Sequence, residues 1–351
     1  LTGNDQIGDY AYLDTYRSAY QYQGIGTLGP DRLYNPKYGW EVNKKLEGAV
    51  ELGFLNDRIL LTTAWYRNSS SNQLINYQLA GTTGYASVLQ NSPATVQNTG
   101  LEMELTTTNI SRRALTWSTS VNFTVPKNKL LSFPNIESSS YANTYIVGKP
   151  LNITKVYRYL GVNSSTGLYE VEDVNGDGQY TPEDKVSYYI QGENFYGGIN
   201  NSFTFKGIQA DILFQFVSQK GQLSYLEYGG GELSFNNGIG NRPASASQGR
   251  WEKSGDNAIK QYFSRADDAA AALNRFITSD ALTGDSYYIR LKNVSLSYQL
   301  PNRLLKGIKG RFYLQGQNLL TFTDYKGLDP ESGISSLPPL TTVVAGIQLT
   351  F

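Results

Sequence analysis

The sequence lacks cysteine and histidine, and it holds one methionine among its 351 residues. Without histidine there is no His-based zinc site, no histidine general base and no Ser-His-Asp triad. A cysteine-free chain suits an oxidising compartment. Lys plus Arg and Asp plus Glu each number 30, so the formal net charge is zero. Because no basic field or Arg-rich stripe is present, we expect no nucleic-acid partner.

Long apolar runs are also missing. No stretch of about 18 apolar residues occurs, which argues against a transmembrane helix. The chain begins with the polar segment LTGNDQIGDY and shows no signal peptide. We therefore expect a mature product, an expression fragment or a piece of something longer.

Tyrosine and glycine are abundant, with 27 and 35 residues respectively. Tyrosine is apolar along its ring and polar at its tip, which suits the aromatic girdles of membrane barrels. A soluble β-sandwich rich in tyrosine has the same composition. Composition alone leaves both architectures open.

Two-residue alternation of apolar and polar side chains predicts strands in hairpin pairs. The predicted pairs are 46–54 with 58–67, 101–106 with 115–124, 195–205 with 208–219, and 287–300 with 308–320. Asn56-Asp57 and Lys206-Gly207 supply tight turns. The apolar phase slips within 287–300, and a bulge near Lys292-Asn293 restores it. A last strand, Val343–Phe351, ends on its apolar side.

Connections between these strands alternate between short and long. The long polar segments are 68–97, 125–195, 220–285 and 321–340. Soluble sandwiches rarely need loops above about 15 residues, whereas outer-membrane barrels combine short periplasmic turns with long outer loops. The pattern therefore predicts an all-β, transmembrane antiparallel β-barrel with a wet, polar lumen. Residues 6–17 would be its first ascending strand, and 18–43 an outer loop, which makes about ten strands.

Apolar residues of these strands should face lipid. The expected outward residues are Leu101, Met103, Trp117, Val121, Phe214, Phe312, Leu314 and Ile347. Residues 264–276 are rich in Ala and Leu and predict a short scaffold helix in an outer loop. The outer loops carry many tyrosines that could stack on sugars or grip peptides, although packing is the preferred interpretation. These are Tyr141, Tyr145, Tyr157, Tyr159, Tyr188, Tyr189, Tyr225 and Tyr228.

The sharpest local motif is DVNGDGQYTPED at 173–184. Its oxygen-bearing residues have the spacing of a calcium loop of about twelve residues, with Gly178 at the sharp turn. The candidate metal ligands are Asp173, Asn175, Asp177, Gln179 (through its carbonyl), Thr181 and Asp184. Asp184 stands where an EF-hand has Glu, and flanking helices are not evident. The two open interpretations are a structural calcium site and a metal-free Asn/Asp/Gly turn.

Other motifs do not indicate catalysis or cofactor binding, and we expect no enzyme. Glu102 and Glu104 lie on one strand face, where ordinary lumen-facing charges are the preferred interpretation over a glycosidase pair. Gly229-Gly230-Gly231 lacks the following Lys-Ser/Thr of a phosphate loop. Asn68-Ser69-Ser70 matches a glycosylation acceptor and is interpreted as ordinary loop.

Several stretches resemble one protein family. They are WEVNKKLEGAVELGFLNDRI (40–59), NSPATVQNTGLEMEL (91–105), DVNGDG (173–178), YYIRLKNVSLSYQLP (287–301), QGQNLLTFTDYKGLDPE (315–331) and IQLTF (347–351). Together they resemble the SusC/RagA-type TonB-dependent outer-membrane transporters of Bacteroidetes. The resemblance implies a 22-stranded barrel, of which residues 1–351 would be the C-terminal section with about the last ten strands. The plug domain and the N-terminal strands would be absent from this chain.

The resemblance also implies partners and a role. The whole transporter would import glycan or peptide, with a SusD-like surface lipoprotein as lid and TonB acting through the plug. Further partners would be the N-terminal part of the same barrel, an oligosaccharide or peptide substrate, and outer-membrane lipid. The alternatives are a soluble secreted β-domain that binds or hydrolyses glycan, and a passive porin. We expect that the chain does not transport alone: a strand near Ile7–Tyr16 would pair with the N-terminal part, and Val343–Phe351 with the first strand of the barrel.

Overall fold

The structure is a computed structural model that describes residues 10, 12–79, 81–83, 85, 87–223, 244–264, 266–301, 308–325, 327–333 and 337–351. Its contacts divide the chain into two units. Unit 1 comprises Leu1–Ala49, Ala64–Leu101 and Pro126–Leu151. Unit 2 comprises Val50–Thr63, Glu102–Val125 and Asn152–Phe351. Four long strands contribute residues to both units.

The main element is an antiparallel sheet with the strand order β18-β17-β16-β14-β13-β8-β7-β4-β3, and the short β15 also pairs with β14. The bounds are β3 (Val42–Phe54), β4 (Ile59–Ser71), β7 (Thr95–Arg112), β8 (Leu115–Ser132), β13 (Gly192–Phe205), β14 (Ile208–Gln222), β15 (Thr283–Asp285), β16 (Tyr288–Gln299), β17 (Lys309–Thr323) and β18 (Thr342–Thr350). All four predicted hairpin pairs are confirmed. Except for β16, which is shorter, these strands are longer than predicted because pairing continues into the polar segments.

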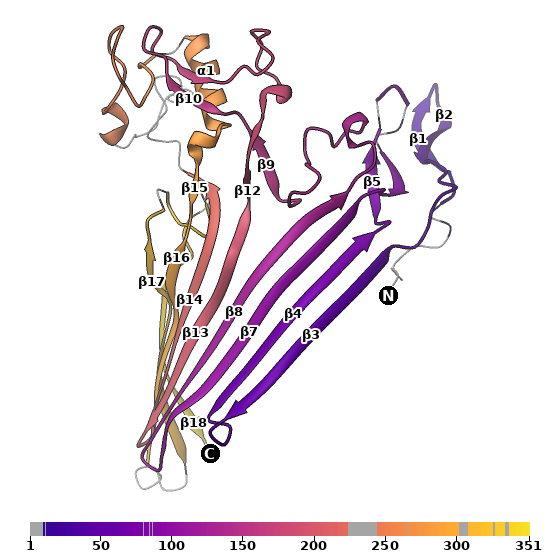
Figure 1. Cartoon of the computed structure of the whole chain (residues 1–351). Helices are drawn as coiled ribbons and strands as arrows, with labels where there is room; N and C mark the ends of the chain where they lie inside the picture. Colours follow the sequence, from indigo (N-terminus) through magenta and orange to yellow (C-terminus); the bar gives the residue numbers. More distant parts are fainter. Residues whose placement is uncertain are drawn as a thin grey trace. The chain divides into compact units, whose positions relative to one another are not determined.

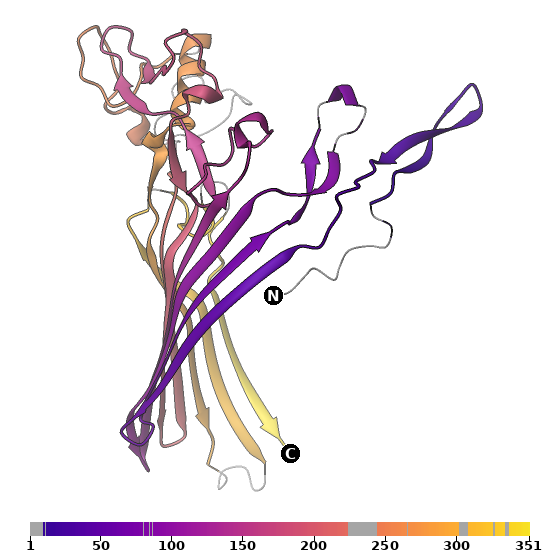
Figure 2. The same cartoon turned by 45° about the vertical axis from the view of Figure 1, so that its right-hand side comes forward.

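Tight turns connect these strands at one end of the sheet within unit 2, and the C-terminus lies at the same end (Figure 2). Between β3 and β4, Leu55, Asn56 and Asp57 all have positive φ angles. Between β13 and β14, Lys206 and Gly207 have φ angles of 46° and 87°. Positive φ at both central residues matches the twist of the flanking strands, which is why so short a turn suffices.

The predicted bulge in β16 is confirmed at Lys292. Leu291 pairs with Phe214, and the next paired residue, Asn293, pairs with Leu213. The register with β17 shifts at the same point. Lys292 is therefore the extra residue, and it restores the alternation on which both faces of the sheet depend.

One face of the unit 2 sheet is mainly apolar. Val121 lies opposite Ile199, which lies opposite Phe214. Trp117 of β8 is connected to Leu314 of β17 by a row of directly paired residues that crosses β13, β14 and β16. Phe312 of β17 lies opposite Ile347 of β18. Directly paired residues point to the same side of a sheet, so six of the eight predicted outward residues share one face, here called the apolar face. Leu101 and Met103 lie on β7.

The opposite side, here called the polar face, carries Gln209, Asp211, Gln215 and Gln219 of β14. Ser295 and Arg290 lie opposite Asp211 and Gln215, respectively. The sequence pattern predicts this division into an apolar and a polar face.

The expected strand at 6–17 and loop at 18–43 are wrong where the structure describes them. Strands β1 (Thr15–Tyr22) and β2 (Ile25–Arg32) form a two-stranded sheet of their own. Gln23 and Gly24 have φ angles of 52° and 78°, which suit a two-residue hairpin turn. Residues 6–9 lie outside the described part of the chain. A local hairpin turn thus replaced the barrel strand that alternation suggested.

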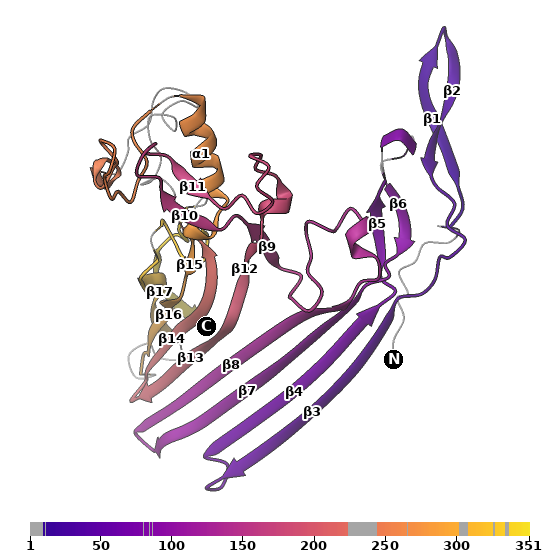
Figure 3. The same cartoon turned by 45° about the horizontal axis from the view of Figure 1, so that its top comes forward.

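The remaining elements of unit 1 lie in its long connections. Strands β5 (Leu74–Gln78) and β6 (Ser87–Asn91) form a hairpin, and two short 3-10 helices, η1 (Gly81–Thr83) and η2 (Ile136–Ser138), accompany them. Figure 3 shows the β5–β6 hairpin. A small core is formed by Val96, Leu130, Phe133 and Ile136.

The long connections of unit 2 fold at the end of the sheet opposite the tight turns (Figure 1). Their elements are β9 (Ile153–Val156), β10 (Tyr159–Val162), β11 (Tyr169–Val171), η3 (Pro182–Asp184), β12 (Ser187–Ile190), η5 (Ala244–Ser247), α1 (Asp267–Ile277) and η6 (Asp280–Leu282). Helix α1 confirms the helix predicted at 264–276. Among the residues that the structure describes, no helix is both long and apolar enough to cross a membrane.

Candidate functional site

The loops of unit 2 pack together into a small folded region, here called the cap, from residues 153–190, 244–264 and 266–282. Helix α1 buries Ala269, Ala272, Leu273 and Phe276, which recur at helical spacing on one face. Phe276 stacks on Tyr169 of β11 with ring centroids 4.1 Å apart. Two connections far apart in sequence therefore share one hydrophobic core.

Hydrogen bonds join the same two connections. Gln261 is fully buried; its Oε1 accepts from the Tyr169 N–H at 3.3 Å, and its Nε2 donates to the Ala269 carbonyl at 2.9 Å. The Tyr157 N–H donates to Thr278 O at 3.1 Å, and the Asp280 N–H donates to Tyr157 O at 3.0 Å. Buried polar groups satisfied in this way hold the cap in one arrangement.

Trp251 closes the cap over the β10–β11 turn. Its Nε1 donates to the Ser164 carbonyl at 3.0 Å. Gly167 has a φ of +71°, and a Cβ on it would lie 2.4 Å from the Trp251 ring. Glycine is therefore required twice at this position, for its conformation and for the close approach of the indole.

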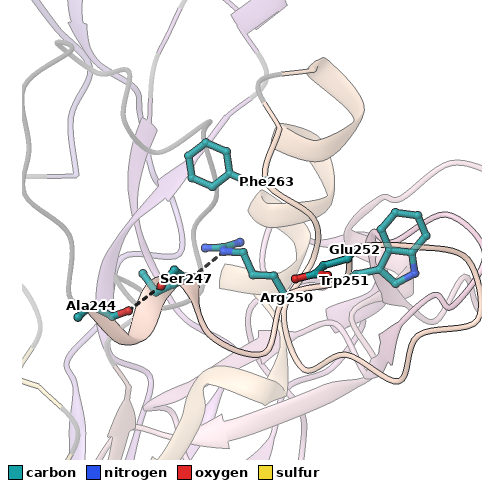
Figure 4. Close-up of a pocket in the computed structure, with 7 residues that line it drawn as sticks. Ala244, Ser247, Arg250, Trp251, Glu252 and Phe263 are labelled. Atoms are coloured by element: carbon teal, nitrogen blue, oxygen red, sulfur yellow. Dashed lines mark hydrogen bonds between the residues drawn. The ribbon is translucent and has the colours of Figure 1, made fainter.

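A pocket of about 400 Å³ lies in the cap beside Trp251. It is lined by Ala244, Ala246, Ser247, Arg250, Trp251, Glu252 and Phe263. Figure 4 shows Arg250 extending between η5 and Phe263. Its Nε donates to Ala246 O at 2.7 Å, and its guanidinium carbon is 5.7 Å from the centroid of Phe263. The volume is in the range of small-ligand sites.

In the 173–184 loop, the predicted calcium site, backbone N–H groups donate hydrogen bonds to the side-chain oxygens of the same loop. Asp173 accepts from the N–H groups of Gly176 and Gly178, each at 2.8 Å. Asp177 Oδ1 accepts from the Gln179 N–H at 2.7 Å, and Asn175 Oδ1 accepts from the Asp177 N–H at 3.1 Å. Within the described ranges, no group of three or more Asp, Glu, His or Cys side chains is placed to hold a metal ion.

Asp184 has a structural role in this loop. It is fully buried, and it accepts from the N–H groups of Thr181 at 2.8 Å and Val174 at 3.0 Å. Thr181 caps η3 in return by accepting from the Glu183 N–H, which completes a capping box. The bond from the Thr181 backbone is the main reason that the pKa of the Asp184 carboxyl is below its ordinary value of 3.8. Calcium binding stays a prediction.

A charged cluster around a buried arginine was missed by the sequence reasoning. Arg290 of β16 is 1% exposed, and its two terminal nitrogens pair with Asp329 and Glu331. Its Nε donates to Thr321 Oγ1 at 3.0 Å. All three charged residues lie within the stretches that carry the family resemblance. The available signals were an Arg on a strand and an Asp-Pro-Glu sequence in a loop.

The other candidates have simpler outcomes. Tyr141 and Tyr145 stack with centroids 5.7 Å apart, and Tyr159 packs on Phe276, which agrees with a packing role. Asn68-Ser69-Ser70 is not loop, because β4 continues through Ser71. Glu102 and Glu104 are exposed on β7. Tyr225, Tyr228 and the three glycines at 229–231 lie outside the described residues.

Comparisons with known proteins agree with the sequence resemblance. The chain is 27% identical over 365 residues to TonB-dependent receptor P3 of Formosa agariphila, covering 94% of this chain and 35% of that protein. It is 23% identical over 382 residues to TonB-dependent receptor SusC of Bacteroides thetaiotaomicron, covering 100% of this chain and 37% of that protein. No family model matches the chain.

Among solved structures, the RagAB peptide transporter matches with a TM-score of 0.76 at 23% identity, covering 100% of this chain and 40% of that chain. The RagAB peptide importer in its "open-open" state matches with a TM-score of 0.75 at 22% identity. The resemblance to SusC/RagA-type TonB-dependent transporters and the antiparallel fold of their barrels are thus confirmed. The chain spans well under half the length of these relatives. That it is their C-terminal section stays a prediction.

Proposed function

We propose that this chain forms barrel wall and outer loops of an active nutrient importer in the bacterial outer membrane, energised by TonB. The main support is sequence similarity to TonB-dependent receptors along 94% or more of the chain. The two-faced sheet is consistent with this function, because a barrel wall needs one face for lipid and one for a wet lumen. The chain itself would carry out no enzymatic step.

The proposed partners come from the resemblance. A SusD-like lipoprotein would lie over the outer loops, and TonB would act through a plug domain outside these residues. The cargo would be a glycan or a peptide; of the matched relatives, RagAB is named a peptide transporter. The soluble glycan-binding or hydrolytic domain is the alternative, and the names of the relatives do not favour it.

The test is growth of a strain in which the gene for the full-length protein is deleted and then restored. With peptides or with oligosaccharides as the sole nutrient, we expect the deletion to abolish growth on one class. Restoration should rescue growth only when TonB is functional. Growth that is independent of TonB would favour a passive porin, and a protein that fractionates as soluble would favour the alternative.

Structural calcium binding at 173–184 is proposed separately. The loop offers carboxylate and carbonyl oxygens, which are the ligands that calcium prefers. Calcium binding would require the side-chain oxygens to give up the hydrogen bonds that they accept from backbone N–H groups. We expect millimolar calcium to slow amide exchange in the loop of the full-length protein. An Asp173→Asn variant should lose that response, and unchanged exchange in the unmodified protein would contradict the proposal.

A further inference from the structure

Residues 327–333, here called the ledge, fold back onto the sheet after β17. The Pro330 carbonyl accepts from Gln219 Nε2 at 2.7 Å and from Ser286 Oγ at 3.1 Å. Asp329 and Pro330 are buried, whereas Leu328 is 59% exposed. The segment that precedes the last strand is therefore held against β14 and β16.

The register shows which face the ledge covers. Arg290 lies directly opposite Gln215 on β14 and Thr321 on β17, so these three side chains point to the same side. Gln219, four residues from Gln215 on the same strand, shares that side. This is the polar face, and the ledge lies on it near the cap end of the strands.

Ion pairs tie the ledge to the sheet, and hydrogen bonds within the ledge hold its shape. Arg290 pairs with both Asp329 and Glu331. Asp329 Oδ1 accepts from the N–H groups of Glu331 and Ser332, each at 2.9 Å, and the Gly333 N–H donates to Asp329 O at 2.9 Å. Just before the ledge, Tyr325 is buried and its hydroxyl donates to Gln222 O at 3.0 Å.

The charges make this attachment hard to open. Lifting the ledge would leave the Arg290 guanidinium without its two carboxylates in a buried position, and an unpaired buried charge is strongly unfavourable. A planar guanidinium that binds two carboxylates also fixes their geometry, which a flexible ammonium does not. The ledge is therefore built as a fixed element rather than a swinging one.

We propose that the ledge is a fixed constriction at the outer mouth of the import path, and that Arg290 is its positioning residue. The inference rests on the proposed function in one respect, namely that the polar face lines the lumen. A rigid projection from that wall narrows the passage and limits the size of the solutes that pass. Leu328 and the half-exposed Glu331 side chain form its free surface.

The test uses the full-length transporter on a cysteine-free background; this chain contributes no cysteine of its own. A reporter, Gln317→Cys, is placed on the polar face between the ledge and the tight turns. Maleimides of graded size are added to intact cells, and the labelling rate is measured for each. Leu337→Cys, at a position 82% exposed, is the control for general reactivity.

We expect labelling of Gln317→Cys to fall steeply with maleimide size. In Arg290→Met, the labelling rate for the largest maleimide should rise about tenfold. This is the change expected if the free energy that holds the ledge on the sheet falls by about 1.4 kcal/mol. The rate for the smallest maleimide and the control position should not change. Arg290→Lys should give an intermediate result. The proposal would be overturned if Gln317→Cys were labelled at a rate independent of maleimide size while Arg290 is unchanged. It would also be overturned if Arg290→Met left the size dependence unchanged.

Three additions keep the test decisive if Arg290→Met does not insert. Heat-modifiable mobility reports insertion, and the variant Arg290→Met/Asp329→Asn/Glu331→Gln removes all three charges together. A spin label at Leu328→Cys should also be immobilised when Arg290, Asp329 and Glu331 are unchanged. A freely mobile label in that protein would refute a fixed ledge. Nutrient uptake is followed in parallel: its absence would contradict the proposed function, whereas labelling and mobility judge the ledge separately.

Discussion

At the residue scale, Asp184 shows how a metal-ligand pattern can carry a structural role. Each carboxyl oxygen of Asp184 accepts from one of the N–H groups of Thr181 and Val174. Replacing Asp184 with Asn removes the negative charge that strengthens both bonds and turns one of the two acceptors into an NH2 donor. We expect faster amide exchange at both positions in Asp184→Asn. Asp177→Asn, which alters an exposed carboxylate of the same loop, should leave these two amides protected.

The same carboxyl gives a pH dependence. Its pKa is lowered in the folded loop from the ordinary value of 3.8, so its ionised form stabilises the loop. That stabilisation is complete above the ordinary pKa and declines as the pH falls below it towards the lower, folded pKa. Exchange at Val174 and Thr181, corrected for the intrinsic pH effect, should accelerate only below about pH 4. Acceleration between pH 5 and 7 would contradict this assignment.

Neighbouring residues on β17 test the two faces of the sheet. Leu314 lies on the apolar face, and Gln315 lies on the polar face. In the full-length protein, Leu314→Arg should cost ~2–4 kcal/mol if that face meets the middle of the bilayer, and Gln315→Arg should cost much less. The comparison is made by the denaturant concentration at which the barrel unfolds. Equal costs would show that the faces are wrongly assigned.

At the element scale, the cap depends on close packing between its two connections. Gly167→Ala would introduce both a strained positive φ and a clash with Trp251, whose ring lies 2.4 Å from the new Cβ. Gly255→Ala is the matched control, because its φ is +93° and nothing lies within 4 Å of its Cβ. We expect limited proteolysis to cut the cap faster in Gly167→Ala than in Gly255→Ala. Equal rates would mean that the contact with Trp251 is unimportant.

At the scale of the whole molecule, the sheet has two edge strands. Among the described strands, β18 and β3 each have a single neighbour in the sheet. Unpaired strand edges are very unfavourable in lipid, so further strands must cover them if the sheet lies in a membrane. Residues 1–351 expressed alone with a signal peptide should aggregate or be degraded in the periplasm. Stable, heat-modifiable insertion with TonB-dependent uptake would contradict the expectation that the chain cannot act alone.

The sequence by itself determined the features that local physics sets. Side-chain alternation predicted the paired strands and their two faces, the phase slip predicted the bulge at Lys292, and Ala-rich composition predicted helix α1. These patterns depend on residues a few positions apart, where backbone geometry alone relates the side chains.

Only the tertiary structure decided the rest. The strand expected at 6–17 is replaced, where described, by the β1–β2 hairpin, because alternation cannot say which neighbour a strand pairs with. Gln261 accepts a hydrogen bond from the Tyr169 N–H, 92 residues away, and Arg290 forms an ion pair with Asp329, 39 residues away. A lone polar residue carries no sign of its partner until the chain has folded. The buried charges that fix the ledge therefore became visible only when the strands and loops were placed together.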